Sequence, residues 1–234
     1  MFNDWRDTHG KVILDFLKFL NKETDQFTLK GGTALLTCYG LDRFSEGIDL
    51  DGRKRDIRET ARRFCNIYGY SLHITKDTNV VKRCAIDYGN SEHRLKVEVS
   101  YRQPNRRPEV ETVINSIKVY TIESLAIQKS NAFQKRDTLR DIYDLAFICL
   151  NYFDQLSETT KDMMRNALEY KGLDQLEYIL ATQEDPLIDK DKLEEDFLKM
   201  HDKLGILFTL NDDLVQSEEQ MQTDKEIIKS RGRR

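Results

Sequence analysis

The chain has 234 residues, of which 39% are hydrophobic and 33% charged, and its formal net charge is −4. Its 3 prolines and 11 glycines exclude collagen-like and low-complexity chains, and its length predicts one large globular domain or two small ones. No apolar run reaches the roughly 18 residues that a membrane-spanning helix requires, so we expect no membrane contact.

The chain's start and its cysteines both predict a cytoplasmic protein. The start, MFNDWRDTHG, lacks the basic region followed by an apolar core that is typical of a signal peptide. The cysteines form no Cys-x-x-Cys pair, and scattered cysteines of this kind are typical of buried thiols in a reducing compartment. They are Cys38, Cys65, Cys84 and Cys149.

Charge is distributed unevenly along the chain. Residues 1–150 carry 25 Lys and Arg against 21 Asp and Glu, whereas residues 151–234 carry 12 against 20. The basic excess gathers in one short stretch, which fits either a polyanion-binding surface or a solvated helix face. Its members are Arg53, Lys54, Arg55, Arg58, Arg62 and Arg63.

Helical and strand patterns alternate over the first 70 residues. Apolar residues at helical spacing predict a helix over 11–20 and another over 54–68, the latter with Ile57, Ala61, Phe64 and Tyr68 on one face. Between them we expect a short strand at 27–29, a helix that starts near Ala34 with Thr33 as its cap, and a strand at 47–51.

Residues 71–120 have a β pattern. Alternating runs predict strands at 71–74, 80–88 and 94–99, with Gly89-Asn90 as a two-residue turn and a further short strand at 117–119. In the third of these strands Val97 and Val99 are expected to face the core, which leaves Lys96 and Glu98 on the opposite face.

After Thr121 the pattern is helical, with helices expected at 121–134, 138–152, 157–170, 173–181 and 190–204. The charged closing segment is expected to fray. The sequence therefore predicts an α+β fold, in which a mixed sheet flanked by helices over residues 1–120 is followed by a helical region over residues 121–234.

The strand at 47–51 carries an unusual polar face. Alternation places Gly47, Asp49 and Asp51 on one face and Ile48 and Leu50 on the other. Two carboxylates on one face, with a glycine where a third would stand, are typical of a metal site that lacks one member.

Two further pieces favour phosphoryl or nucleotidyl transfer. Gly31-Gly32-Thr33 precedes a helix, and backbone N–H groups at a glycine-flanked helix start bind phosphate readily. Glu98 lies on a second strand, and carboxylates on adjacent strands can share a Mg²⁺ that substrate phosphates complete. Each piece is weak by itself, since a Gly-Gly is usually a turn and Glu98 alone would be a solvated strand residue.

At these residues the sequence resembles a known family. KGGTALLTCYGLDRFSEGIDL is similar to the glycine and Asp-x-Asp motifs of the AbiEii-type nucleotidyltransferase toxins, within the DNA polymerase β-like nucleotidyltransferase superfamily. SLAIQKSNAFQKRDTLRDIYDLAFI is similar to the family's Lys and Arg-Asp-x-x-Asp-Leu motif, here Lys129, Arg136, Arg140, Asp141 and Asp144. The resemblance covers about residues 27–150 and implies a nucleotidyltransferase-like sheet.

The resemblance also implies roles for individual residues. Gly31, Gly32 and Thr33 would contact the triphosphate of an NTP substrate, and Lys129 would neutralise its charge. Asp49 and Glu98 would bind Mg²⁺, and Asp141 would contribute to the nucleotide or acceptor pocket. Arg43 and Ser45 fall on motif positions, where local hydrogen bonding is the simpler interpretation; a structural ion pair is equally open for Arg140 and Asp144.

The chain departs from the family at Gly47, where the first carboxylate of the Asp-x-Asp pair is expected. Loss of a bridging ligand removes a full negative charge, so Mg²⁺ affinity should fall. Asp51 is a poor substitute, because four residues span about 13 Å along an extended strand.

Three functions of different class therefore stay open. The first is a Mg²⁺-dependent nucleotidyltransferase that moves an NMP from an NTP to an acceptor such as tRNA or another RNA, as the toxin of a toxin–antitoxin or phage-defence pair with a cognate antitoxin protein. The basic stretch at 53–63 would then hold the nucleic acid. The alternative, motivated by Gly47, is a catalytically weakened nucleotide- or nucleic-acid-binding module; a pure interaction protein is a third possibility.

Overall fold

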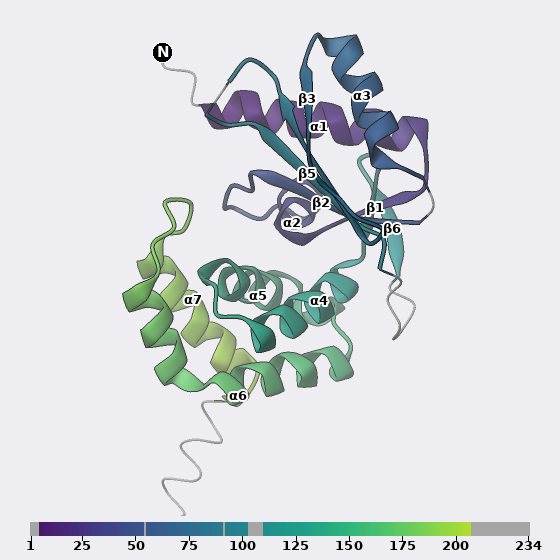
Figure 1. Cartoon of the computed structure of the whole chain (residues 1–234). Coiled ribbons are helices and arrows are strands. Elements are labelled where there is room, and N and C mark those ends of the chain that lie inside the picture. Colours follow the sequence, from purple (N-terminus) through teal and green to yellow (C-terminus); the bar gives the residue numbers. More distant parts are fainter. Residues whose placement is uncertain (1–4, 54, 91, 103–109, 207–234) are drawn as a thin grey trace, which may run out of the picture.

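The structure is a computed structural model that describes residues 5–53, 55–90, 92–102 and 110–206. A mixed sheet with its helices forms one part of the molecule, and a group of helices forms the other (Figure 1). The closing segment, for which fraying is expected, lies outside the described residues.

Seven strands form one sheet in the order β3-β4-β5-β2-β1-β7-β6. Their bounds are β1 Phe27–Lys30, β2 Gly47–Gly52, β3 Ser71–Asp77, β4 Val81–Asp87, β5 Leu95–Ser100, β6 Glu111–Ile114 and β7 Ile117–Tyr120. Strand β2 runs antiparallel to β1 and parallel to β5, so it occupies the centre of the sheet with a neighbour on each side.

The helices are α1 Trp5–Glu23, α2 Gly31–Tyr39, α3 Ile57–Tyr68, α4 Ile122–Lys135, α5 Leu139–Tyr152, α6 Glu158–Thr182 and α7 Lys190–Lys203, with a short 3-10 turn at Phe153–Gln155. Among the described residues, none of the helices is long and apolar enough to cross a membrane.

The buried face of the sheet follows from strict alternation. Ile48 and Leu50 of β2 and Val97 and Val99 of β5 are at most 1% exposed. Helices α1 and α3 cover this face and pack on each other through Phe16 and Phe64, whose ring centroids lie 5.2 Å apart. Residues on the opposite face of β2 and β5 are therefore left to face the helical part of the molecule.

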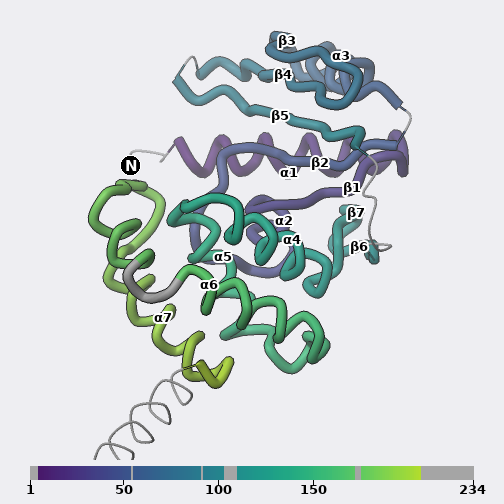
Figure 2. Tube along the Cα trace, turned by 60° about the horizontal axis from the view of Figure 1, so that its bottom comes forward, coloured from purple at the N-terminus to yellow at the C-terminus, as the bar shows by residue number. Residues whose placement is uncertain are grey.

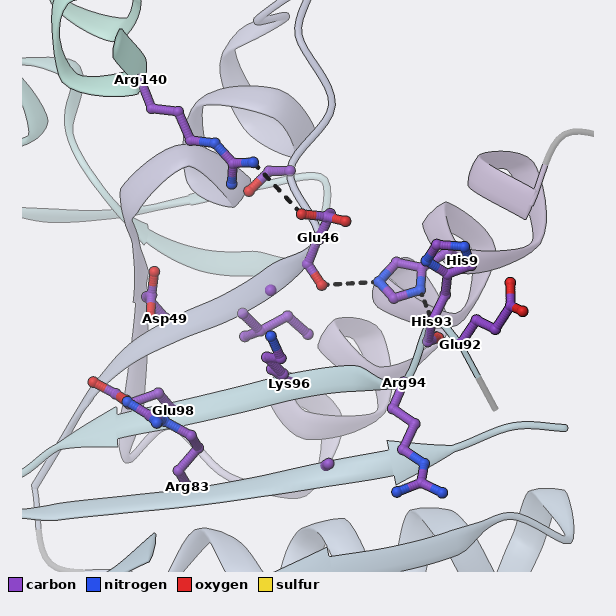
Figure 3. Close-up of a pocket in the computed structure, with 14 residues that line it drawn as sticks. His9, Glu46, Asp49, Arg83, Glu92, His93, Arg94, Lys96, Glu98 and Arg140 are labelled. Carbon is purple, nitrogen blue, oxygen red and sulfur yellow. Dashed lines mark hydrogen bonds and ion pairs between the residues drawn. The ribbon is translucent and has the colours of Figure 1, made fainter. Parts of the chain in front are cut away.

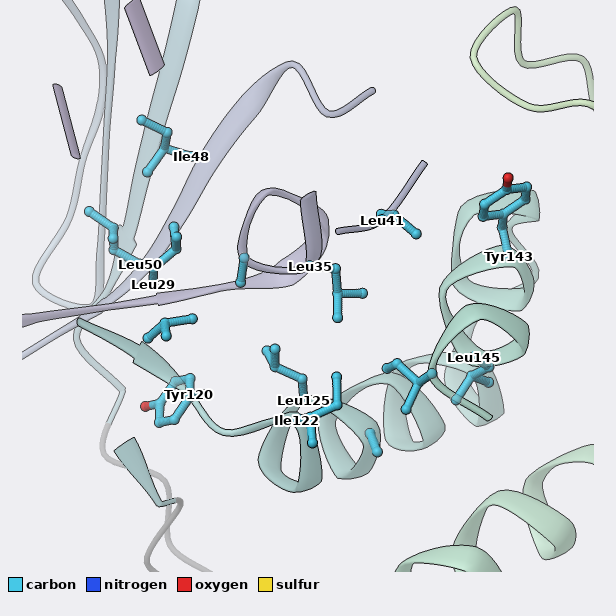
Figure 4. Close-up of a cluster of buried hydrophobic side chains, with 14 of the residues drawn as sticks. Leu29, Leu35, Leu41, Ile48, Leu50, Tyr120, Ile122, Leu125, Tyr143 and Leu145 are labelled. Carbon is cyan, nitrogen blue, oxygen red and sulfur yellow. The ribbon is translucent and has the colours of Figure 1, made fainter. Parts of the chain in front are cut away.

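The two parts share one hydrophobic core. Leu35 of α2 and Leu125 of α4 are fully buried in the same cluster, which continues to Leu145 of α5 (Figure 4). The view in Figure 2 shows α4 and α5 lying beside α2. Thr121 caps α4 by accepting a hydrogen bond from the backbone N–H of Ser124, as the sequence predicts.

Three predictions about local structure are wrong, and one strand has no counterpart among the predictions. Thr33 is the third residue of α2 and does not cap it, because the helix already begins at Gly31. The connection from β4 to β5 spans residues 88–94 and is not a two-residue turn at Gly89-Asn90. Residues 157–170 and 173–181 belong to the single helix α6, since Gly172 costs an interior helix only about 1 kcal/mol. Strand β6 was not predicted.

Candidate active site

Asp49 and Glu98 are direct neighbours across two strands. The parallel pairing of β2 and β5 sets Asp49 opposite Glu98, and Gly47 opposite Lys96. Since Val97 and Val99 face the core, both carboxylates lie on the other face, toward solvent. The placement expected for Glu98, on the strand next to Asp49, is confirmed.

The segment Gly31-Gly32-Thr33, called the glycine loop from here on, lies against the Asp49 carboxylate. Strand β1 pairs Lys30 with Asp49, and α2 begins at the next residue. Gly31 has a φ of +73°, and a Cβ there would lie 3.1 Å from Oδ2 of Asp49. Glycine is thus required twice, for the left-handed backbone and for the close approach. The free N–H groups of the first turn of α2 consequently open beside Asp49.

Thr33, Arg43 and Ser45 lie beneath this loop and are buried. The Thr33 hydroxyl donates to the Gly47 carbonyl and lies 2.8 Å from the Ser45 hydroxyl. A Cβ at Gly32 would come within 2.7 Å of the Arg43 guanidinium. These side chains hold α2 to the segment that leads into β2; of the three, Ser45 also lines a cavity described below.

An ionic network, buried except for the Arg136 side chain, joins the two sequence motifs. The Arg43 guanidinium lies 2.6 Å from Oδ1 of Asp144, and the Lys129 ammonium lies 2.5 Å from Oδ2 of the same carboxylate. Lys129 also pairs with Asp141 at 3.2 Å, and Arg136 pairs with Asp141 at 2.6 Å. Three cations thus share two carboxylates, which leaves one net positive charge.

Asp141 orients cations. It does not itself line either of the two cavities that are described in the next paragraphs. Its side chain is 1% exposed. Burial alone would raise its pKa, but the hydrogen bond from Arg136, the charge of Lys129 and the hydrogen bond from Thr138 outweigh burial and the pKa is lowered. The ionised carboxylate therefore fixes Lys129 and Arg136 at the cavity wall.

A basic cavity of about 800 Å³ opens between the glycine loop, β2 and α4. Five of its lining residues are cationic and two are acidic, so its walls favour a polyanion. The lining comprises Lys30, Gly31, Gly32, Asp49, Asp51, Ser100, Arg102, Gln128, Lys129, Asn131, Ala132, Lys135 and Arg136.

A second cavity of about 680 Å³ lies on the other side of Asp49 (Figure 3). His9 supports its wall by hydrogen bonding to the Glu46 carbonyl at 2.8 Å. Arg140 lies 3.5 Å from the Glu46 carboxylate and 2.5 Å from that of Asp185. The lining comprises His9, Ser45, Glu46, Gly47, Ile48, Asp49, Arg83, Ala85, Glu92, His93, Arg94, Lys96, Glu98 and Arg140.

Asp49 is the acidic residue common to both cavities. The residue is solvent-exposed, but its carboxylate lies close to Gly31 and beside Glu98. Burial in these surroundings raises its pKa, and the neighbouring charge of Glu98 adds to the rise, while Lys30 and Lys129 oppose it. A carboxylate with a raised pKa at the junction of two cavities is a candidate proton acceptor.

Nothing in the backbone requires glycine at position 47. Gly47 is absent from the described glycines with positive φ. A Cβ there would lie 3.5 Å from the Lys96 carbonyl oxygen, which is an ordinary contact. An aspartate would therefore fit. Asp51 does not replace it, because its carboxylate is held by Lys30 at 2.5 Å and by the Tyr120 hydroxyl at 3.0 Å.

The carboxylates present do not fit a two-ion cluster. Glu98 already accepts a hydrogen bond of 2.6 Å from Nε of Arg83, and Gly47 supplies no ligand. In the described part of the chain, no three His, Cys, Asp or Glu side chains are arranged to hold a metal ion. Asp49 is thus the carboxylate of this pair that has no arginine ion pair in the described structure.

Three of the cations in the basic stretch after β2 are paired with carboxylates. Arg58 pairs with Asp56 and Asp77, Arg63 with Glu23, and Arg53 with Glu111. The stretch leads into α3, which covers the sheet face opposite Asp49. Its placement and pairing match the solvated-helix interpretation.

Several cavity residues were not singled out from sequence. Arg83 of β4, Arg102 after β5 and Lys135 of α4 belong to no motif, and only the tertiary fold brings them to the site. Alternation along β4 gives one usable signal, because it sets Arg83 on the face opposite buried Cys84. Arg140 and Asp144 both form ion pairs, though not with each other.

The fold has close structural relatives. JHP933 from Helicobacter pylori shares 25% identity with this chain and a TM-score of 0.71, over 95% of this chain and 100% of that protein. A second H. pylori protein, provisionally described as a nucleotidyltransferase, shares 24% identity and a TM-score of 0.69, over 91% and 99% of the two chains.

Curated proteins gave no match to this chain. In contrast, the family model described as the nucleotidyl transferase AbiEii toxin of type IV toxin–antitoxin systems matches residues 16–217, which is most of the chain. The chain therefore belongs to the AbiEii family of nucleotidyltransferase toxins.

Proposed function

We propose that this protein transfers a nucleoside monophosphate from an NTP to an acceptor hydroxyl. The observation that carries the proposal is that a basic cavity and a second cavity meet at Asp49. The basic cavity suits a triphosphate, since Lys129, Arg136 and the N–H groups at Gly31 and Gly32 line it. The second cavity leaves room for an acceptor on the other side of the reacting phosphorus.

In the proposed reaction the acceptor oxygen attacks the α-phosphorus. A bond forms between that oxygen and the α-phosphorus, the bond from the α-phosphorus to the bridging oxygen breaks, and pyrophosphate leaves. The hydroxyl proton passes to the Asp49 carboxylate, whose raised pKa suits proton acceptance. Lys129 and Arg136 stabilise the charge on the leaving pyrophosphate.

The NTP would enter as its Mg²⁺ complex, so the ion is part of the substrate. Mg²⁺ keeps several waters and needs only one or two protein carboxylates beside substrate phosphates. The ion would add to the charge neutralisation that the cavity's cations supply. One ion carried by the nucleotide fits the residues present better than a resident pair.

Three finer elements belong to this proposal. The acceptor is an RNA, with tRNA as the expected class, and the reaction takes place in the cytoplasm. The protein acts as the toxin of a toxin–antitoxin or phage-defence pair and is countered by a cognate antitoxin protein. The family match supports the toxin context.

The test is incubation of the purified chain with each α-labelled NTP, Mg²⁺ and total RNA. We expect slow label transfer from one NTP and a loss of about 10²-fold or more in Asp49→Asn. The matched control is Asp51→Asn, on the same strand and face but paired with Lys30. Absence of transfer by both the wild-type chain and Gly47→Asp, although both bind NTP, contradicts the proposal.

A second candidate is favoured by two observations, the missing side chain at Gly47 and the Arg83 partner of Glu98. It is a nucleotide- or nucleic-acid-binding module with weakened catalysis. This candidate predicts NTP binding that changes little when Mg²⁺ is replaced by EDTA. Calorimetric titration in the two buffers decides, since binding that depends strongly on Mg²⁺ argues against it.

A further inference from the structure

Arg83 lies beside Glu98 in the second cavity, the one proposed to hold the acceptor. The antiparallel pairing of β4 with β5 sets Arg83 opposite Glu98, and β2 sets Asp49 on the other side of Glu98. Nε of Arg83 lies 2.6 Å from Oε2 of Glu98, and its Nη2 contacts the same oxygen. Figure 3 shows the guanidinium and the two carboxylates on one face of the sheet.

The other cavity arginines have partners outside this group. Arg94 pairs with Asp87 at 3.0 Å, and Arg140 pairs with Asp185 and Glu46. Arg83 is different, because its ion pair in the described structure is to the carboxylate that would otherwise face a metal ion. The cavity thus places one cation where a metal would bind.

The residues at positions 47 and 83 both change the net charge of the carboxylate group, and therefore its affinity for a metal ion. Asp49 and Glu98 with Arg83 carry a net charge of −1, whereas three carboxylates without an arginine would carry −3. Metal affinity rises with the charge and number of oxygen ligands, so both differences lower it. The Arg83–Glu98 pair is partly exposed, and such pairs contribute little to folding stability. Its effect is therefore expected on the site and not on the fold.

We propose that Arg83 takes the place of a second metal ion and that Arg83 and Gly47 together make this a site without resident metal. Arg83 neutralises Glu98 and holds it beside Asp49, so that Glu98 is not a metal ligand. The positive charge on the acceptor side of Asp49 is then supplied by the Arg83 guanidinium in place of a metal ion. The inference rests on the proposed function in assigning Asp49 to the reacting phosphate, but metal exclusion itself is measurable without turnover.

The experiment is a Mn²⁺ titration of the full chain without nucleotide, with free Mn²⁺ counted by electron paramagnetic resonance. The variants are Gly47→Asp, Arg83→Gln and the double variant, each checked for folding by thermal unfolding. We expect weak binding by the wild-type chain and binding at least about tenfold tighter in the double variant than in Gly47→Asp alone, because the double variant has three unpaired carboxylates.

Two further variants test the role of charge at position 83. Arg94→Gln removes the same charge from the same cavity but leaves Glu98 paired, and it should not tighten Mn²⁺ binding in the Gly47→Asp background. Arg83→Lys keeps a cation and should stay weak. If Arg83→Gln disrupts folding, the comparison of Arg83→Lys with Arg83→Ala in the same background gives the same information.

Three results would overturn the inference. They are tight Mn²⁺ binding by the wild-type chain, equal binding by Gly47→Asp and the double variant, and equal tightening by Arg94→Gln. None of these depends on label transfer, so failure of this inference is distinct from failure of the proposed nucleotidyl transfer.

Discussion

The guanidinium of Arg43 lies directly against the α-carbon of Gly32, at a distance where a Cβ would come within 2.7 Å of Nη2. Arg43 is 4% exposed and is held by Asp144, so it cannot move aside into solvent. The glycine loop and the buried network are therefore packed as one unit.

Gly32→Ala is expected to destabilise the protein. The substitution gains up to about 1 kcal/mol of helix propensity. It should lose about 1–3 kcal/mol from crowding against Arg43, so the net effect on the free energy of unfolding is a loss. Urea denaturation measures it. Gly10→Ala is the control, because a Cβ there would lie 3.7 Å from the Phe44 ring and should raise stability. Equal stabilisation by both variants would contradict the packing argument.

Asp49→Asn should lower activity while leaving stability unchanged or raised. The folded-state pKa of Asp49 is raised, so its ionised form is disfavoured in the fold. The free energy of unfolding that Asp49 contributes accordingly falls as pH rises from its unfolded-state pKa, near 4, through its folded-state pKa. Thermal unfolding at neutral pH against the wild-type chain checks this. Asp51→Asn, which loses the Lys30 pair, should be less stable, and the opposite order would refute the prediction.

Asp144→Asn should strongly destabilise the protein, because it leaves Arg43 and Lys129 short of a buried counter-charge. Breaking a buried pair in this way costs about 3–5 kcal/mol. Asp144 is fully buried, with both cations within 2.6 Å. Denaturant midpoints give the loss. Glu195→Gln breaks an exposed pair with Lys199 and should not move the midpoint. Comparable midpoints for the two variants would show that the network is not stabilising.

His201 predicts a loss of stability below neutral pH. Its ring is 2% exposed in α7, neither ring nitrogen has a hydrogen-bond partner in the described structure, and burial lowers its pKa. The unfolded state therefore binds more protons once pH falls below about 6.5, and stability drops from there toward the folded pKa. Carboxylates with lowered pKa, such as Asp141, add their losses only near pH 4 and below.

Thermal unfolding between pH 8 and pH 5 measures this loss. His201→Leu should flatten the dependence in that window, because the buried titrating group is gone. A wild-type midpoint that does not change between pH 7 and pH 5 would contradict the assignment.

The placement of Glu98 beside Asp49 could be predicted because alternation fixes the faces of β2 and β5, and the family resemblance sets them side by side. Arg83 could not be placed. A two-residue turn at Gly89-Asn90 would set Val81 opposite Glu98, whereas the longer connection shifts the register by two residues and sets Arg83 there. Register depends on loop geometry that the sequence signals only weakly.

The ion pairs of the buried network could not be predicted from the sequence either. Lys129, Asp141 and Asp144 were recognised from their motif, but their partners depend on how α4 and α5 dock on the loop that holds Arg43. Asp141, for which the resemblance implies a place at a substrate pocket, lies behind Lys129 and Arg136, the two cations that line the basic cavity. Local periodicity reports which face of a helix is apolar and not which distant charge meets it.

The pairing of Arg43 with Asp144 also dictates when the site can form. The two residues are 101 positions apart, and β2 meets β5 across a separation of nearly fifty. Contacts of such span form slowly, because loop closure must be completed before they contribute. During synthesis Arg43 leaves the ribosome long before its counter-charge does. The glycine loop therefore acquires its final support only after α5 has docked, which makes assembly of the site a late step in folding.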